Sequence, residues 1–212
     1  PYEKRHISKR FRSVNSIAAV LAKTRADSGR KPLRIVGVTG SYGKSNFLDI
    51  ASQILSTEYQ VLRSQPDKAG SLENAEKLIR EGLTSDCDLM LIEIASKHQG
   101  DVKEFCATLM PDFGVVTGIA ERNMGTFNSI DQIAETQMEI ADCLRTSDGL
   151  LVLNYEDGIL RKQKADSLPL LRYGIYQGGG APSHLDIWAS DIKYRLGGSE
   201  FILHDKAQLS YA

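Results

Sequence analysis

Short apolar runs alternate with segments of helical periodicity along most of the chain, and this alternation limits the fold more than any other feature. The apolar runs predict strands at Leu33–Val38, Tyr59–Arg63, Asp88–Ile94, Phe113–Thr117 and Gly149–Asn154. The segments between them predict helices at Lys44–Ser56, Leu72–Glu81, Val102–Leu109 and Ile130–Leu144. A helix between two strands returns the chain to the same end of a sheet, so such strands pair in parallel. We therefore expect an α/β fold with a mostly parallel sheet and helices on both faces.

The two ends of the chain differ from this central part. Residues Val14–Ala26 have helical spacing, and we assign 1–32 to a basic helical segment or linker. Residues 33–157 form the predicted α/β core. Beyond Asp157, short strands are predicted between glycine-rich stretches, at Leu170–Tyr176, Leu185–Tyr194 and Ser199–His204. We expect residues 158–212 to form a small antiparallel sheet subdomain beside the core.

A glycine-rich segment, GVTGSYGKS at Gly37–Ser45, joins the first core strand to the helix that follows. In such a turn, backbone N–H groups and the positive end of the helix dipole can surround phosphate groups. The lysine can reach the terminal phosphates, and the hydroxyl after it can bind Mg²⁺. Val38 replaces the first glycine of the full G-x-x-x-x-G-K-[ST] pattern. The segment predicts a P-loop NTPase-like core that binds ATP and Mg²⁺. The predicted binding residues are Thr39, Gly40, Ser41, Tyr42, Gly43, Lys44, Ser45 and Asn46.

An acidic residue, Glu93, ends the apolar run Leu89–Ile92. A carboxylate at the end of a buried strand is costly unless it is paired or binds a metal. Parallel strands end at the same edge of the sheet as the P-loop, and Mg²⁺ prefers oxygen ligands. We predict that Glu93 acts with Lys44 in the reaction and joins Ser45 as a ligand of the metal or its water.

The composition excludes some classes of function. The formal net charge of -1 gives no general attraction to nucleic acid. Cys87, Cys106 and Cys143 lack the spacing of a metal site or a disulfide framework, which favours a reducing, cytoplasmic setting. No apolar run is long enough to span a bilayer, and no signal peptide is recognised. A basic cluster within Lys4–Arg12 allows contact with anionic lipid, although a solvated helix start is the simpler interpretation.

Several stretches resemble the Mur ligases, a family of ATP-dependent ligases. The loop Val38–Ser45 is similar to the family's T-G-[ST]-x-G-K-[ST], which tolerates the missing first glycine. Residues Glu93–Asp101 (EIASKHQGD) resemble the E-[LM]-G-A-x-H-x-G-E stretch of the branch that adds D-alanyl-D-alanine to UDP-N-acetylmuramoyl-tripeptide. Further matches follow in the family's order at Pro111–Asp112, Gly125–Ser129 and Leu153–Asp157. The resemblance covers about residues 33–203, the family's central ATP-binding domain.

The resemblance implies an activity in peptidoglycan precursor synthesis and roles for individual residues. Family members transfer the γ-phosphoryl group of ATP to a substrate carboxylate, and an amine then attacks the acyl phosphate. It implies that Lys44 and Ser45 serve the phosphates and magnesium, that Glu93 binds magnesium, and that Asn154 and Asp157 lie beside the nucleoside. The implied substrates are a UDP-muramoyl-peptide and an amino acid or dipeptide. The family's amino-terminal UDP-sugar domain and carboxyl-terminal domain lie outside the resembling segment.

Two positions depart from the family pattern. Asn123 stands where the family usually has a magnesium-binding histidine, and Gln137 where it usually has a carbamylated lysine. Neutral amides do not match a charged carbamate as ligands of a hard dication, so the second metal site is expected to be absent. Glu135 or Glu139 offers a substitute carboxylate from an adjacent turn. Arg122 offers a positive charge where the second cation would lie.

Three functions stay open. The first is a carboxylate–amine ligase, and the second is a degenerate, non-catalytic ATP-binding or scaffolding module of the same family. The third is another P-loop enzyme, such as a kinase or a folate-type γ-glutamyl ligase. His98 falls at a histidine of the family and is predicted to lie near the acceptor substrate, with an ordinary surface histidine as the alternative. The segment His98–Asp101 favours the muramoyl branch.

Overall fold

The computed structural model describes residues 19, 21, 32–65, 70–121, 126–145, 149–165 and 168–207. The basic cluster at Lys4–Arg12 lies outside these ranges. So does the helix expected at Val14–Ala26, apart from Ala19 and Leu21, which are both helical. Within the described ranges, no helix combines the length and the apolar character needed to cross a membrane.

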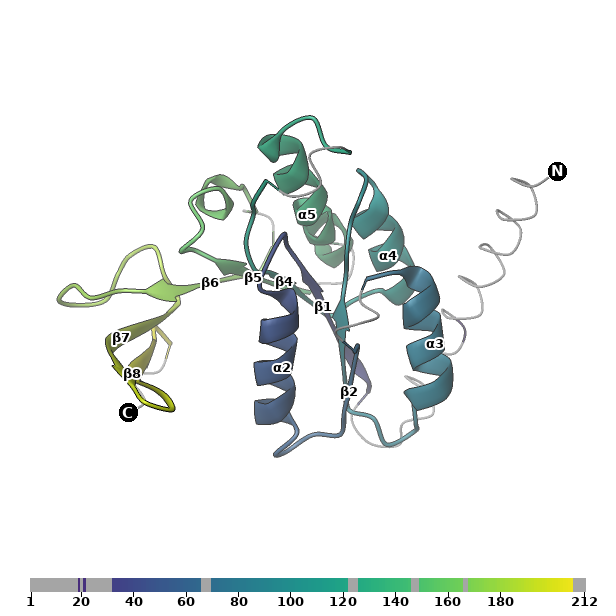
Figure 1. The fold of residues 1–212 in the computed structure, drawn as a ribbon, viewed down its shortest axis with the longest axis horizontal. Coiled ribbons are helices and arrows are strands. Elements are labelled where there is room, and N and C mark those ends of the chain that lie inside the picture. The colour runs from purple at the N-terminus through teal and green to yellow at the C-terminus, as the bar shows by residue number, and fades with distance from the viewer. Residues whose placement is uncertain are drawn as a thin grey trace.

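The described residues form the alternating elements that the apolar pattern predicts (Figure 1). The strands are β1 (Arg34–Thr39), β2 (Val61–Arg63), β3 (Leu89–Glu93), β4 (Phe113–Val116), β5 (Leu150–Asn154), β6 (Leu170–Ile175), β7 (Ile187–Arg195) and β8 (Gly198–Asp205). The helices are α2 (Lys44–Leu55), α3 (Leu72–Gly82), α4 (Asp101–Leu109) and α5 (Ile130–Arg145), with a 3₁₀ turn, η2 (Leu160–Lys162). Each element predicted from residue 33 onward is present, with ends within two residues of those expected. The turn η2 was not expected.

The strands belong to one eight-stranded sheet in the order β2-β3-β1-β4-β5-β6-β7-β8. Every neighbouring pair from β2 to β7 is parallel, and β7 pairs with β8 in the antiparallel sense. The mostly parallel α/β fold class is therefore confirmed. The antiparallel part is smaller than expected, because β6 pairs in parallel with β5 and continues the main sheet. The connection through η2 is long enough to return the chain for parallel pairing. The domain boundary at residue 158 stays a prediction.

Helices cover both faces of the sheet, and each face has its own apolar core. Helix α2 lies on one face, where Leu48 packs with Val38, Leu91 and Val115. Helices α3, α4 and α5 lie on the other face and contribute most of the larger core, as Figure 1 shows. Strands β7 and β8 extend the sheet away from these helices. The ligand edge of such a sheet is the one where the parallel strands end.

Helix α5 approaches the sheet closely because two strands carry glycine beneath it. A Cβ atom at Gly37 of β1 would lie 3.3 Å from Cδ1 of Ile140, and one at Gly114 of β4 would lie 3.0 Å from it. Ile140 itself is completely buried. Its side chain therefore fills the space that the missing side chains leave, and this contact fixes the height of α5 above β1 and β4.

Replacing Ile140 by alanine should leave a cavity between α5 and the sheet. We expect the free energy of unfolding, measured by urea denaturation, to fall by about 2–5 kcal/mol. Ile54→Ala is the matched control, because Ile54 is 64% exposed on α2 and should change stability by less than about 0.5 kcal/mol. Equal losses in the two variants would contradict this packing.

Candidate functional site

The alternation of side chains along β1 and β3 brings different chemistry to the two faces of the sheet at its carboxyl edge. Leu91 of β3 belongs to the core under α2, and Ile35 of β1 belongs to the core under α3–α5. Side chains two or four residues apart in a strand share a face. Glu93 therefore faces α2, and Thr39 faces α5. The glycine-rich loop leaves β1 between these two side chains.

The loop presents an uncapped helix amino terminus. Gly43 is the N-cap of α2 and has a positive φ of 81°, and Gly40 has a φ of 130°, a region that favours glycine. No side chain caps the first turn of α2, and no acidic residue lies in it. Helix α3, in contrast, begins with a hydrogen bond from the N–H of Asn74 to the hydroxyl of Ser71. The first-turn N–H groups of α2 therefore offer donors to an anion.

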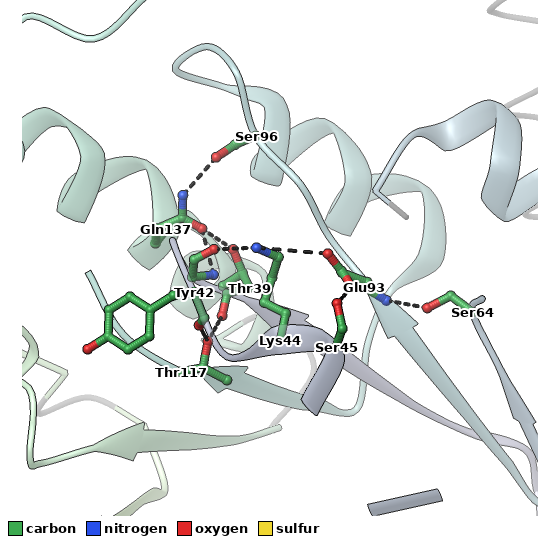
Figure 2. Close-up of polar contacts among 10 residues, drawn as sticks. Thr39, Tyr42, Lys44, Ser45, Ser64, Glu93, Ser96, Thr117 and Gln137 are labelled. Carbon is green, nitrogen blue, oxygen red and sulfur yellow. Dashed lines mark hydrogen bonds and ion pairs between the residues drawn. The ribbon is translucent and has the colours of Figure 1, made fainter. Parts of the chain in front are cut away.

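On the α2 face, three side chains converge on one point (Figure 2). The hydroxyl of Ser45 donates to Oε2 of Glu93 over 3.0 Å, and Nζ of Lys44 lies 3.9 Å from Oε1 of Glu93. Glu93 is only 7% exposed. Its own N–H donates to the hydroxyl of Ser64, at 2.9 Å. The ammonium group also donates to the carbonyl oxygen of Gly40, at 2.7 Å, and thus bends back over the loop.

On the α5 face, Gln137 joins the loop to the segment after β3. Its Oε1 accepts hydrogen bonds from the hydroxyl of Thr39 and, at 2.8 Å, from the N–H of Gly40. Its Nε2 donates to the hydroxyl of Ser96, at 2.7 Å. Gln137 is 4% exposed, and Figure 2 shows its amide between the loop and Ser96. These three hydrogen bonds give the buried amide of Gln137 partners for its oxygen and its nitrogen, without which its burial would destabilise the fold.

The end of β4 supports the loop from a third direction. The hydroxyl of Thr117 lies 2.5 Å from the carbonyl oxygen of Tyr42 and 3.1 Å from that of Thr39. The N–H of Ser41 donates to the carbonyl oxygen of Gly118, at 2.7 Å. These contacts leave little freedom for the loop backbone, so its conformation is formed before any ligand enters.

Tyr42 extends from the loop to Asp157, which follows β5. Its hydroxyl donates to Oδ2 of Asp157, at 3.1 Å, and the same oxygen accepts from the N–H of Ile119 at 2.7 Å. Oδ1 accepts from the N–H groups of Ile159 and Leu160. Burial acts to raise the pKa of Asp157, but these hydrogen bonds to the carboxylate outweigh it, and the pKa is lowered overall. Burial and the nearby Asp157 carboxylate raise the pKa of Tyr42.

The structure brings part of the predicted set together and leaves the rest apart. Lys44, Ser45 and Glu93 converge, and the loop residues surround the amino terminus of α2, where Asn46 is exposed. Asn154 lies nearby but donates to the carbonyl oxygen of Thr117, at 2.9 Å, and supports the end of β4. The nucleoside contacts of Asn154 and Asp157 remain predictions.

Several other candidates are distributed around this centre. His98 is exposed on the loop before α4, with Nδ1 3.8 Å from Oδ2 of Asp101. Glu135 is exposed on α5. Glu139 accepts from the N–H groups of Gly100 and Lys103, so its carboxylate holds the start of α4. Arg122 and Asn123 lie outside the described residues.

Sequence reasoning missed a cavity beside Glu93 and the role of Gln137. The cavity has a volume of about 320 Å³, lies between β2, β3 and α3, and is lined in part by Ser64, Asn74 and Glu93. A signal for Gln137 existed, because it and Thr136 are the two polar residues that the structure buries among the apolar residues of α5. These buried apolar residues are Ile133, Ala134, Ile140, Ala141 and Leu144.

The arrangement can hold a phosphorylated ligand with one small cation. Lys44 supplies a positive charge and the start of α2 supplies N–H donors. The oxygens of Ser45 and Glu93 lie 3.0 Å apart, as adjacent ligands in an octahedron with bonds of roughly 2.1 Å would. The described residues contain no group of three or more His, Cys, Asp or Glu side chains that could hold a metal by themselves. The two oxygen donors of Ser45 and Glu93 fit Mg²⁺, which keeps several water or phosphate ligands.

The sequence of this chain matches a known protein family and several curated proteins. The family model described as the Mur ligase middle domain matches residues 38–211. A UDP-N-acetylmuramoyl-tripeptide--D-alanyl-D-alanine ligase from Mycobacterium leprae is 26% identical over 178 residues, which cover 82% of this chain and 34% of the relative. The chain thus spans about a third of the length of the curated relatives that it matches.

Solved structures share the fold. MurF from Acinetobacter baumannii superimposes with a TM-score of 0.75 at 20% identity, covering 93% of this chain and 41% of that one. MurF ligase from Thermotoga maritima, solved in complex with ADP, gives a TM-score of 0.72 at 23% identity and covers 90% of this chain and 42% of that one.

Asp157→Asn tests how strongly the loop depends on its support by Asp157. The amide cannot replace both carboxylate oxygens as acceptors, so one pair of donors, such as Ile119 N–H and the Tyr42 hydroxyl, loses its partner. We expect the free energy of unfolding at pH 7, from urea denaturation, to fall by about 1–3 kcal/mol. Asp86→Asn, at an exposed position, should have little effect.

The same variant has a defined pH dependence. Because folding lowers the pKa of Asp157, the carboxylate stabilises the fold above the ordinary aspartate pKa of about 3.9. That contribution is lost as the pH falls through the lower folded-state pKa. The stability difference between the two proteins should therefore shrink below about pH 4. A difference as large at pH 3 as at pH 7 would contradict the assigned role.

Proposed function

The chain belongs to the Mur ligase family, whose middle domain it carries, and we propose that it is the ATP-binding part of an ATP-dependent carboxylate–amine ligase. The proposed pathway is peptidoglycan precursor synthesis. Support for the substrate class comes from relatives named UDP-N-acetylmuramoyl-tripeptide--D-alanyl-D-alanine ligase. The proposed substrates are accordingly a UDP-muramoyl-peptide and an amino acid or dipeptide, here D-alanyl-D-alanine. Other parts of the ligase, outside the matched third, would contribute to binding them.

One observation carries the proposal of ATP binding. Lys44 and Ser45 open a helix whose first turn has no side-chain cap, and both side chains meet the buried carboxylate Glu93. A buried acid beside a lysine and a hydroxyl, at the ligand edge of a parallel sheet, is the arrangement that a nucleoside triphosphate with Mg²⁺ requires. Ser45 and Glu93 would hold the cation, which when bound neutralises charge on the phosphates.

The proposed reaction has two steps that use this site for the first. An oxygen of the substrate carboxylate attacks the γ-phosphorus, the bond from that phosphorus to the bridging oxygen breaks, and ADP leaves. The amine of the second substrate then attacks the acyl carbon, releasing phosphate and a proton. Lys44 would donate hydrogen bonds to the phosphate oxygens during transfer after leaving the carbonyl oxygen of Gly40. The preformed loop keeps the reacting groups aligned.

The non-catalytic alternative keeps one specific observation in its favour. The neutral amide of Gln137 occupies the centre of the α5 face, and its oxygen and nitrogen are bonded to Thr39, Gly40 and Ser96. Glu139, the substitute carboxylate, binds the start of α4 instead. A domain with one cation site could bind ATP without completing the ligase reaction.

The remaining assignments are part of the proposal. His98 would lie near the acceptor substrate because its loop follows Glu93 directly, and its exposure leaves it accessible. Arg122 would offer positive charge to the phosphates. Asn154 and Asp157 would border the nucleoside. We propose a reducing compartment such as the cytoplasm, because the spacing of the three cysteines is not that of a disulfide framework. Contact of the basic amino-terminal segment with a membrane surface is a further proposal.

Lys44→Ala should remove most of the affinity for ATP. The variant loses a charged donor at a partly buried site, and we expect at least a tenfold rise in Kd, measured by calorimetric titration with ATP and excess Mg²⁺. Lys77→Ala is the control, because Lys77 lies on α3 with an exposed side chain. Equal affinity of the Lys44 variant and the unaltered protein would refute the P-loop assignment.

Glu93→Gln separates the metal role from the phosphate role. The amide keeps the size of the side chain but is a weaker ligand for a hard dication. In calorimetric titrations of ATP at increasing Mg²⁺, the affinity of the unaltered protein should rise with the cation by at least fivefold, and that of the variant should rise much less. If both proteins respond equally to Mg²⁺, Glu93 does not hold the cation.

A further inference from the structure

We propose that Gln137 is a positioning residue that couples the P-loop to the segment Ala95–Asp101, so that ATP binding orders the segment that carries His98. The proposal rests on ATP binding at the P-loop. It assigns a role to the chain's own amide at this position, and it predicts a response to the nucleotide outside the phosphate site.

Gln137 spans the place where β1 and β3 separate. The hydrogen bonds between these strands end with the N–H of Ile94, which donates to the carbonyl oxygen of Val38 at 2.8 Å. Beyond that point the segment after β1 turns into the P-loop, and the segment after β3 runs toward α4. The hydrogen bonds from Gln137 to Gly40 and Ser96 connect these two segments across the gap.

The donors and acceptors around the side chain require an amide. The backbone N–H of Gly40 can only donate, so the side-chain oxygen must face the P-loop and the nitrogen must face Ser96. A lysine would present only donors to Gly40 and Thr39. A glutamate would place a charge where the residue is 4% exposed, at a cost that no described cation in contact with it offsets. Glutamine satisfies every neighbour at this position.

Gly40 links this amide to the phosphate-binding lysine. The carbonyl oxygen of Gly40 accepts from Nζ of Lys44, at 2.7 Å, while its N–H donates to Gln137. A phosphate that draws Lys44 away from Gly40 changes the contacts of the residue that Gln137 holds. The path therefore runs from phosphate through Lys44 and Gly40 to Gln137, and from there to Ser96.

Helix α5 holds the receiving segment at a second point. Two residues after Gln137, the carboxylate of Glu139 accepts from the N–H of Gly100 at 2.7 Å and from that of Lys103 at 2.9 Å. Within the segment, Oδ2 of Asp101 accepts from the N–H groups of Lys97 and His98. The segment is thus tied to α5 at both ends, and the exposed His98 lies between the two ties. Ordering at Ser96 restricts His98.

Hydrogen–deuterium exchange with and without ATP and Mg²⁺ tests the coupling, alongside calorimetric affinities. In the unaltered protein, ATP should slow exchange in residues 95–103 at least threefold. Ser96→Ala should keep ATP affinity within about threefold, because the P-loop contacts of Gln137 remain, but lose the slowing. Gln137→Met, which keeps the length of the side chain, should weaken ATP binding about tenfold and lose the slowing even at saturation.

Gln163→Met is the matched control, because the side chain of Gln163 makes one 3.4 Å hydrogen bond to Ile159 away from the P-loop. It should leave both affinity and slowing unchanged. The coupling is overturned if Ser96→Ala retains the ATP-dependent slowing, or if the unaltered protein binds ATP and shows none. Failure of the unaltered protein to bind ATP at all would instead reject the proposed function and the coupling with it. A structural role alone would change affinity or stability without abolishing a ligand-dependent response in Ser96→Ala.

Discussion

The parallel pairing of β1 with β3 on one side and β4 on the other is the constraint on which the whole site depends. The register sets Val38 opposite both Glu93 and Val115, so the three strands end together. A slip of one residue would exchange the faces of every side chain on β1 and move Thr39 away from α5. The glycine pair under Ile140 keeps α5 close enough for its polar side chain to reach that edge.

Neutral hydrogen bonds hold the site on one face of the sheet, and an ion pair holds it on the other. On the α5 face and at the end of β4, amide and hydroxyl groups fix the loop backbone and leave its conformation ready for a ligand. On the α2 face, the buried pair of Lys44 and Glu93 carries opposite charges beside the uncapped start of α2. A buried acid without a cation nearby would destabilise the fold, so Lys44 also stabilises the buried carboxylate of Glu93 in the absence of a ligand.

The segment that matches the Mur ligase middle domain contains the residues of the candidate site. The glycine-rich loop from Thr39 onward, the carboxylate of Glu93 and the loop that carries His98 all lie within the matched segment. The chain covers about a third of its curated relatives, so selection of the two substrates would be shared with the rest of the ligase. In the coupling that we propose, Gln137 would give this domain a route by which a bound nucleotide affects the loop that carries His98.

The sequence alone determined the strands, the helices, the P-loop and the acid at the end of β3. These features follow from local rules: apolar periodicity, glycine at positions of unusual φ, and the cost of burying a charge. Only the tertiary structure decided that β6 continues the parallel sheet, that Asp157 supports Tyr42 and that Gln137 bonds to Gly40. The partners in these contacts lie far apart in sequence, 97 residues in the case of Gln137 and Gly40. They meet because strand order and helix crossovers bring them to one edge, and no local pattern specifies that order.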